Sequence, residues 1–341
     1  MKHTKKLLCV LLSLVMIVGI FGAGTMSASA KGKYYEQKSQ FNSQNYTCYN
    51  FSSDYYVTEK NGKFYVYGSL GGKLKKKISI QCDYSDSFAI KGKYIYYVNY
   101  AKHGIYRVGT NGKNRKKLAS LPKDGDDYFY STALIVAKDK VFYTVTKISY
   151  NGKSSAKSLY KVSLNGKGKK KIDSASSDAY SNGDYLYYLK KGKLVRYGIK
   201  NGKKKTYSAS KSLKNYSIAN MQGNSLYLKK TNSSDKTTVY KMSVKDKKVK
   251  KIVSFYTDEP IHDLIVYNSK VYLSTGTGAG NGIASVSSKG KLNYKYYDKY
   301  DEAGDCLGFY KNYITVNNYT YNSKTYEQIK TKDKKIVKID K

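Results

Sequence analysis

Histidine is scarce in this sequence, and its scarcity excludes several enzyme classes. His3, His103 and His262 are the three present, and none has zinc-ligand spacing to another histidine or a cysteine. The chain also has no G-x-S-x-G, no phosphate-loop motif and no H-E-x-x-H. The glycine-rich run 276–282 resembles a phosphate-binding loop, but no helix pattern follows it, so we interpret it as an inter-strand loop. We therefore expect no catalytic residue, no metal site and no cofactor.

Long apolar runs are absent after residue 30. Residues 1–30 begin with lysines, continue through an apolar run at 7–21 and end in Ala-Ser-Ala, which is the pattern of a signal peptide cut after Ala30. A retained membrane anchor is the alternative, although the run is shorter than the roughly 20 residues that a spanning helix needs. Cys9 precedes most of the apolar run, unlike the lipidated cysteine of a lipoprotein. We expect a secreted, extracellular protein, in one interpretation associated with the cell wall, with residues 31–341 forming one domain.

Tryptophan is absent and proline occurs twice, whereas tyrosine occurs 40 times. Tyrosine favours strands and can bury its ring while its hydroxyl stays in water. Acids are also few: 24 Asp and Glu stand against 63 Lys and Arg, a net charge of +39 that becomes +36 without the three lysines of the leader. This composition predicts β-structure with half-exposed strands, and the charge predicts solubility and attraction to polyanions.

One short pattern repeats along the chain. The copies are FYVYGSLGGKLKKKI at Phe64, IYRVGTNGKNRKKL at Ile105, LYKVSLNGKGKKKI at Leu159, LVRYGIKNGKKKTY at Leu194, VYKMSVKDKKVKKI at Val239, IASVSSKGKLNYKY at Ile283 and a weaker TYEQIKTKDKKIVKI at Thr325. Their second residues run from 65 to 326 over six intervals, a mean of 43.5 residues. A second tyrosine-rich motif precedes each copy, and most of these follow a turn dipeptide such as Lys91-Gly92. One unit therefore has four strands, and a period of about 40–45 residues with four strands indicates a propeller blade.

The stretch 95–118, IYYVNYAKHGIYRVGTNGKNRKKL, resembles the YWTD-type repeat of low-density-lipoprotein-receptor propellers. It more closely resembles a bacterial secreted domain of unknown function with receptor-related-protein-like, TolB-like propeller repeats. The resemblance covers about residues 46–341, but Tyr97–Tyr100 and Tyr143–Thr146 replace the tetrad and contain no tryptophan. It implies a single all-β propeller of four-stranded antiparallel blades. Seven copies favour seven blades, with six or eight as alternatives.

An odd number of cysteines, Cys48, Cys82 and Cys306, would remain after leader cleavage. Cys48 lies in the first repeat and Cys306 opens the last. Because those repeats would be neighbours in a closed ring, a Cys48–Cys306 disulfide is one prediction. Buried thiols are the alternative.

Acids gather in the connections between repeats. Five of six connections hold acidic clusters, and the one at 206–216 holds none. In a propeller these connections lie on one face near the channel, while the lysine-rich turns and fourth strands form the other face and the rim. The preference of Asp for turns is the simpler explanation, but it does not explain why the lysine-rich turns contain almost no Asp.

The sequence thus predicts two ligand-binding surfaces. The acidic collar at the channel mouth comprises Asp83, Asp86, Asp124, Asp126, Asp127, Asp258, Glu259, Asp263, Asp298, Asp301, Glu302 and Asp305. The polyanion-binding surface comprises Lys75, Lys76, Lys77, Arg115, Lys116, Lys117, Lys169, Lys170, Lys171, Lys203, Lys204 and Lys205.

Three functions fit these patterns. The first is a monomeric, non-enzymatic binding module whose basic rim holds anionic cell-wall or surface polymers and whose collar holds a peptide, a sugar or a cation. The second is an extracellular nucleic-acid or polyanion binder, but only Arg107, Arg115 and Arg196 accompany the lysines, so no specific nucleic acid is expected. The third is a glycan-active enzyme with two carboxylates. Sialidase-type Asp boxes end in tryptophan, which is absent here.

Overall fold

The computed structural model describes a chain built from strands. The described residues are 49–51, 56–60, 62–67, 74–78, 87–151, 153, 155, 157–257, 261–267, 269–277, 280–298, 307–310, 313–316, 326–330 and 335–340. They contain strands, turns and bends, and no helix among them is long and apolar enough to cross a membrane. The predicted leader, Cys48, Cys82 and Cys306 lie outside the described residues, so the leader and the disulfide stay predictions.

These strands form seven four-stranded antiparallel sheets, each in chain order, which we call blades 1 to 7. Blades 1 to 3 comprise β1 (Tyr49–Phe51), β2 (Tyr56–Lys60), β3 (Lys63–Tyr67) and β4 (Leu74–Ile78); β5 (Phe88–Lys91), β6 (Tyr94–Asn99), β7 (Gly104–Gly109) and β8 (Lys116–Ser120); β9 (Tyr128–Ala137), β10 (Lys140–Ser149), β11 (Lys157–Ser163) and β12 (Lys170–Ala175). Blades 4 and 5 comprise β13 (Tyr180–Ser181), β14 (Tyr185–Lys190), β15 (Lys193–Gly198) and β16 (Lys204–Tyr207); β17 (Ser217–Gln222), β18 (Ser225–Thr231), β19 (Lys236–Ser243) and β20 (Val249–Tyr256). Blades 6 and 7 comprise β21 (Ile261–Tyr267), β22 (Lys270–Thr277), β23 (Gly280–Val286) and β24 (Leu292–Asp298); β25 (Leu307–Tyr310), β26 (Tyr313–Val316), β27 (Tyr326–Lys330) and β28 (Lys335–Asp340).

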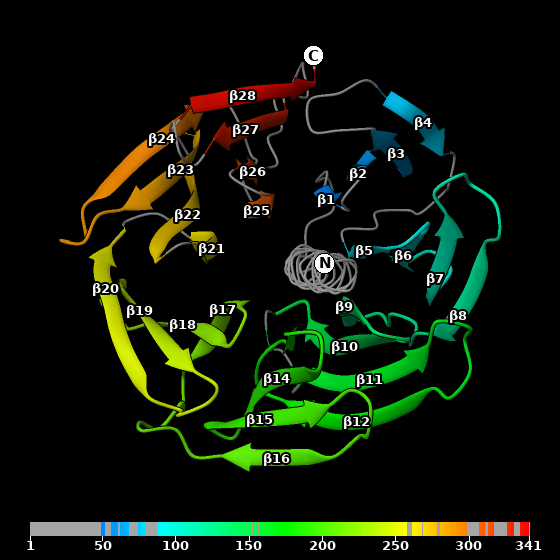
Figure 1. Cartoon of the computed structure of the whole chain (residues 1–341), viewed down its shortest axis with the longest axis horizontal. Helices are drawn as coiled ribbons and strands as arrows, with labels where there is room; N and C mark the ends of the chain where they lie inside the picture. The colour runs from blue at the N-terminus through cyan, green and yellow to red at the C-terminus, as the bar shows by residue number, and fades with distance from the viewer. Residues whose placement is uncertain are drawn as a thin grey trace, which may run out of the picture.

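The blades are arranged around a central axis, with the first strand of each innermost and the fourth at the rim (Figure 1). The predicted all-β propeller is therefore confirmed. Each of the seven sequence copies supplies the third and fourth strands of one blade. The copies repeat because each blade must present the same pair of apolar faces to its neighbours.

The turn between the third and fourth strands shows why the Asn-Gly-Lys motif recurs. In blade 2, the Asn111 side chain accepts a hydrogen bond from Lys113 N (2.9 Å), and Gly112 has a φ of 80° that favours glycine. Asn165 and Asn201 cap the equivalent turns of blades 3 and 4 through their Oδ1 atoms, at 3.0 Å each. The connection spans residues 110–115 in blade 2, so it is longer than the two-residue turn that Asn-Gly predicts.

A β-bulge is repeated in the outer ladder of every blade except blade 4. The pairing register shifts by one residue, for example between Ile105 and Tyr106, because the fourth strand contributes an extra residue. In blade 4, pairing runs from Leu194↔Tyr207 to Tyr197↔Lys204 without a shift. The innermost strand of this blade has two residues.

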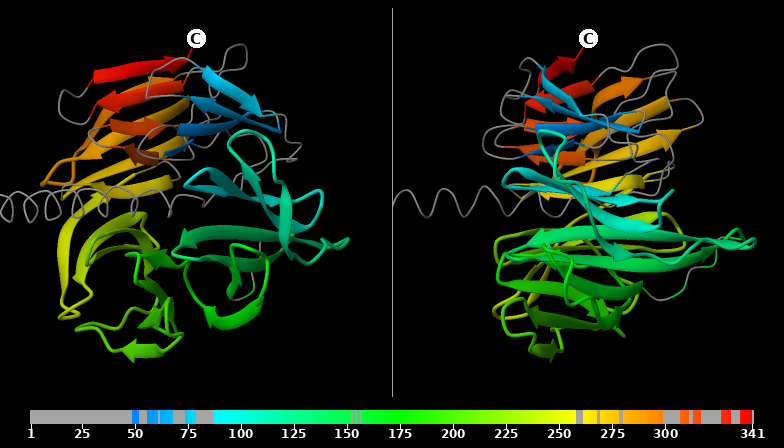
Figure 2. Two further views of the ribbon diagram at one scale, coloured as in Figure 1. Left: turned by 45° about the vertical axis from the view of Figure 1, so that its right-hand side comes forward. Right: turned by 90° about the vertical axis from the view of Figure 1, so that its right-hand side faces the viewer.

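The hydrophobic core is divided among the seams between blades. One cluster joins Tyr96 and Ile105 of blade 2 to Leu134 and Tyr143 of blade 3, all of them buried. Burial of both faces of the sheets in blades 2 to 5 explains why their strand residues read as apolar runs rather than as strict alternation. The β9–β10 hairpin of blade 3 extends beyond the other sheets (Figure 2).

Candidate functional site

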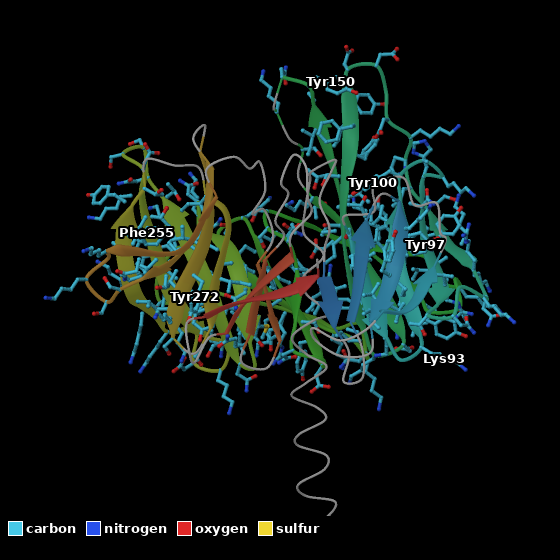
Figure 3. The ribbon with its side chains drawn as sticks, turned by 90° about the horizontal axis from the view of Figure 1, so that it is seen from above. Lys93, Tyr97, Tyr100, Tyr150, Phe255 and Tyr272 are labelled. Atoms are coloured by element: carbon cyan, nitrogen blue, oxygen red, sulfur yellow. The ribbon has the colours of Figure 1, made fainter. Side chains whose placement is uncertain are left out.

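The hairpin of β9 and β10 is the structure's clearest departure from the repeat. These strands form ten residue pairs, whereas the equivalent pair in blade 2, β5 and β6, forms four. The ladder continues for four pairs beyond Val145↔Ser158, the last pair between β10 and β11. Four pairs correspond to about 13 Å of strand at about 3.3 Å per residue. We call residues 128–131 and 146–150 the ribbon; Tyr150 at its end stands above the ring in Figure 3.

One face of the ribbon is apolar at its outer end, whereas Ser131 and Thr146 share this face nearer the ring. Phe129 and Ile148 are paired across the two strands, and the ring of Tyr150 lies 5.9 Å from that of Phe129. Phe129 and Ile148 are half-exposed, and Tyr150 is 68 % exposed. Lower on the same face, Phe142 packs against blade 4 in a buried cluster. The sheet face that is buried at Phe142 therefore continues past the neighbouring blade and carries apolar side chains again at its outer end.

The opposite face carries its own cation. Tyr128, Tyr130 and Lys147 share it by strand alternation. The Lys147 ammonium lies 3.5 Å from the centre of the Tyr128 ring, and the rings of Tyr128 and Tyr130 meet edge to face at 5.6 Å. The Tyr128 ring on this face therefore already has a cation–π partner in Lys147.

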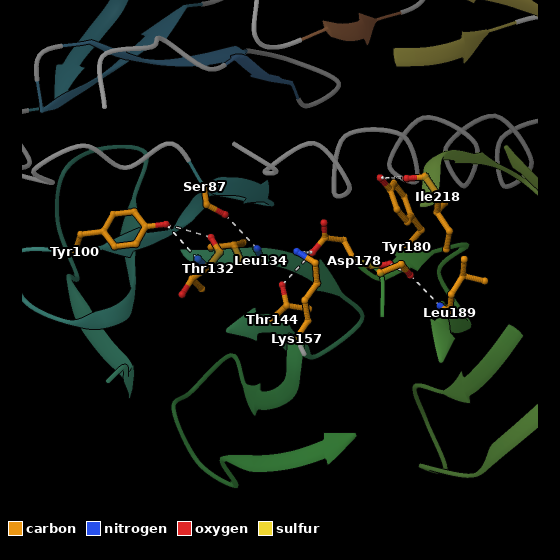
Figure 4. A network of polar contacts seen from close by, with 11 residues as sticks. Ser87, Tyr100, Thr132, Leu134, Thr144, Lys157, Asp178, Tyr180, Leu189 and Ile218 are labelled. Carbon is orange, nitrogen blue, oxygen red and sulfur yellow. Dashed lines mark hydrogen bonds and ion pairs between the residues drawn. The ribbon is translucent and has the colours of Figure 1, made fainter. Parts of the chain in front are cut away.

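Side chains close the channel-side edge of β9. Three backbone N–H groups of β9 at alternate residues point away from β10, and each donates to a side chain. Tyr130 N donates to Asp124 Oδ1 (2.7 Å), Thr132 N to Tyr100 Oη (3.3 Å) and Leu134 N to Ser87 Oγ (3.1 Å). Two of these contacts are drawn in Figure 4. A protected edge does not offer its backbone to another strand.

The outer edge of β10 is closed within the ribbon by the loop that follows it. Lys147 N donates to Ser155 Oγ (3.1 Å), and Ser155 N donates to Lys147 O (2.9 Å). Ser149 N donates to Lys153 O (2.8 Å). Both edges are thus occupied, and the apolar face is the open surface.

Three residues of the predicted acidic collar lie beside the ribbon. Asp124 caps Tyr130, while Asp126 and Asp127 are exposed, and Asp127 O accepts a hydrogen bond from Tyr150 N (3.1 Å). The collar itself stays a prediction, because its other members lie outside the described residues or have undescribed side chains: Asp83, Asp86, Asp258, Glu259, Asp263, Asp298, Asp301, Glu302 and Asp305.

The remaining acids of these connections serve the seam between blades 3 and 4. Asp178 accepts a hydrogen bond from Thr144 Oγ1 (3.3 Å) and pairs with Lys157 (3.1 Å), as Figure 4 shows. Asp173 is 7 % exposed and lies between lysines of blade 4. Neither is a free ligand-binding carboxylate.

Opposing influences set the protonation of Asp173. Burial alone would raise its pKa, but hydrogen bonds from Lys190 and Tyr188 Oη (2.6 Å), one from Ser174 N (2.8 Å) and the charge of Lys204 lower the pKa to about 2. The pKa of Tyr188 is raised by burial and by its donation to the Asp173 carboxylate. The carboxylate is therefore ionised at neutral pH.

The predicted polyanion-binding residues with described side chains are exposed on or beside the fourth strands. They are Arg115, Lys116, Lys117, Lys169, Lys170, Lys171, Lys203, Lys204 and Lys205, whereas the side chains of Lys75, Lys76 and Lys77 in β4 are not described. Lys169 donates to Ser120 O of blade 2 (2.7 Å), and Lys204 donates to Ile172 O of blade 3 (3.0 Å). Fourth strands are sheet edges, and lysines there oppose pairing with other chains. Their placement therefore has a structural cause that needs no ligand.

The spacing of the sequence copies contains a signal for the ribbon. Tyr106 and Tyr160, equivalent in consecutive copies, are 54 residues apart against the mean of 43.5. The additional residues fall mostly in β9, β10 and the loop after them. His103 occupies a turn at φ 43°, and the described residues hold no group of three His, Cys, Asp or Glu that could bind a metal.

Comparisons with known proteins concern the fold. No protein-family model matches the sequence, and no curated protein matches it. Among solved structures, one of two prolyl endopeptidases aligns with 92 % of this chain and 51 % of its own at 9 % identity and a TM-score of 0.58. A puromycin-hydrolyzing peptidase of Mycobacterium tuberculosis aligns with 92 % of this chain and 55 % of its own at 9 % identity and a TM-score of 0.59. TolB from Acinetobacter baumannii aligns with 72 % of this chain and 61 % of its own at 18 % identity and a TM-score of 0.44.

These findings correct the predicted function. A non-enzymatic module for anionic surface polymers, with nucleic acid as its alternative, is contradicted, since the solved structures that match 92 % of the chain are peptidases. The prediction relied on the lysine pattern, which the exposed sheet edges account for. The chain spans about half the length of those peptidases, and at 9 % identity the likeness extends to architecture alone. The architecture that these comparisons establish for this chain is the β-propeller.

Proposed function

We propose that this chain is a polypeptide-binding propeller and that the ribbon is its binding element. The observation that carries the proposal is the apolar face of Phe129, Ile148 and Tyr150, which stands above the ring. Among the described side chains, Tyr150 and Tyr256 are the large apolar ones that are mostly exposed. Aromatic side chains on a rigid β-scaffold give large contact area at little cost in conformational entropy.

The comparison with solved structures supports a polypeptide ligand. Two of the matching chains with TM-scores above 0.5 are described as an endopeptidase and a peptidase. A shared fold does not carry function by itself. The proposal of a polypeptide ligand therefore rests on the side chains of the ribbon, and the structural similarity to peptidases is consistent with it.

An array of blocked synthetic decapeptides, varied in aromatic, aliphatic and charged content, would test the proposal. Phe129→Ala and Tyr150→Ala should each weaken binding of the retained peptides by about ten-fold or more, as central aromatic anchors do. Tyr256→Ala is the matched control, because Tyr256 is 59 % exposed on a different blade. Equal binding by all four proteins would refute the ribbon as the binding element.

Several sequence-based expectations accompany this proposal untested. Export, residence at a cell surface, a monomeric state, membership of the bacterial secreted family and the lack of catalytic activity stay predictions. Following the array peptides by mass spectrometry during binding would detect any hydrolysis.

A further inference from the structure

We infer that the ribbon binds its polypeptide by side-chain docking on the face of Phe129, Ile148 and Tyr150. The ligand segment would carry an aromatic or aliphatic residue next to a single lysine or arginine. This inference rests on the proposed function and specifies the ligand chemistry of the same site.

Elimination selects the face. A polypeptide could add as a strand at an edge, or dock on either face. The edge of β9 is closed by Asp124, Tyr100 and Ser87, and the edge of β10 by the loop that contains Ser155. The Tyr128 face already carries the Lys147 ammonium.

The open face is apolar at the outer end of the ribbon. Phe129 and Ile148 lie side by side, with Tyr150 beyond them. Nearer the ring, this face ends at Thr144, whose hydroxyl donates a hydrogen bond to Asp178 in the connection to blade 4. An apolar side chain of the ligand would gain burial there without disturbing any existing contact of the blade seam.

Charge complementarity selects the cation. Asp127 is tied beside Tyr150 through its backbone carbonyl, and Asp126 precedes it. In the described part of the chain neither carboxylate has an ion-pair partner, although the sequence has 63 Lys and Arg. A ligand cation would gain here at short range, while the chain's net positive charge disfavours a long polycation.

Three blocked peptides test the ligand chemistry by titration calorimetry: acetyl-Gly-Leu-Phe-Lys-Gly-amide and its variants with Gln or Glu in place of Lys. Wild type should bind the Lys peptide about ten-fold more tightly than the Gln peptide, a typical gain for a charge-assisted contact. Asp126→Asn together with Asp127→Asn should reduce that preference to about two-fold or less. Asp139→Asn, at the opposite end of the same hairpin, should leave the preference unchanged.

A fourth peptide separates face docking from strand addition. N-methylation of its Leu and Lys amides removes the hydrogen bonds that a β-strand would donate. We expect its affinity to stay within about three-fold of the parent, because side chains carry the contact. A loss above about ten-fold would overturn face docking.

The outcomes distinguish this inference from the proposed function. Equal binding of the Lys and Gln peptides, with loss of both in Phe129→Ala, would overturn the cation requirement and leave polypeptide binding in place. Tighter binding of the Glu peptide would overturn it as well. If none of the peptides binds, or if Phe129→Ala and Tyr150→Ala bind as wild type does, the ribbon as a polypeptide site fails altogether.

Discussion

Two seams of the ring are joined by side chains of different chemistry. Between blades 3 and 4, the Asp173 carboxylate holds Lys190, Lys204 and Tyr188 Oη. Between blades 5 and 6, the neutral Asn220 amide donates to Val266 O (2.8 Å) and accepts from Val266 N (2.9 Å). In both seams, a polar side chain of one blade binds groups of the next blade.

The two seams differ in their dependence on conditions. The amide of Asn220 is buried, paired in both directions and has no charge to titrate. The ionic seam depends on the protonation of one carboxylate whose lysine partners are 40 % and 45 % exposed. The neutral seam should therefore stabilise the ring at any pH, whereas the ionic seam should do so only while Asp173 is ionised.

Breaking the neutral seam should have the largest effect. Asn220→Ala should lower the free energy of unfolding by about 2–3 kcal/mol, because it leaves the buried Val266 N–H without its acceptor. Urea denaturation would measure the loss. Exposed Asn224→Ala should change stability by less than about 0.5 kcal/mol; equal losses in the two variants would contradict the role of the clasp.

Neutralising the ionic seam should come second. Asp173→Asn should lower the free energy of unfolding by about 2 kcal/mol at pH 7, since a pKa shift from 3.8 to about 2 corresponds to roughly that value. The folded pKa is lower than the unfolded one, so this stabilisation is complete above about pH 5 and is lost as the pH falls towards 2. Denaturation of wild type and variant across this range would show the curves converging. A gap that persists at pH 2 would mean that Asp173 acts through shape alone.

The seam between blades 4 and 5 offers an intermediate case. Tyr180 Oη donates to Ile218 O (3.1 Å) and Ala219 O (3.0 Å) of the next blade. Tyr180→Phe should cost about 1 kcal/mol at every pH from 3 to 8, because it removes one neutral donor. If the loss of stability changed with pH, the seam between blades 4 and 5 would depend on a titrating group, as the ionic seam does.

The partly exposed ion pair beside the seam between blades 3 and 4 should contribute least. Lys157 and Asp178 are 31 % and 26 % exposed, so Lys157→Gln should cost at most about 0.5 kcal/mol at low salt. The cost should disappear in 1 M NaCl, where the Debye length is about 3 Å. Thermal melts at both salt concentrations would detect the difference, and a larger loss that survives salt would show that packing dominates.

Much of the fold could be predicted because its signals are local. The Asn111-Gly112-Lys113 motif specifies its turn through a hydrogen bond between residues two positions apart. Copies of the motif about 43 residues apart indicate a blade. The acids were harder to interpret. Asp124 and Asp173 both belong to acid-containing stretches near the connections between blades, yet one caps the ribbon edge and the other lies in β12, buried among lysines.

The sequence by itself determined the strand pattern, the blade period and the lysine-rich outer strands, because each depends on residues close together in the chain. Only the tertiary structure decided which residues meet across a seam. Asn220 and Val266 are 46 positions apart, and Asp173 meets Tyr188 from 15 positions away. The twist and stacking of the blades set these encounters, and they also decide that the long β9–β10 hairpin presents an apolar face to solvent.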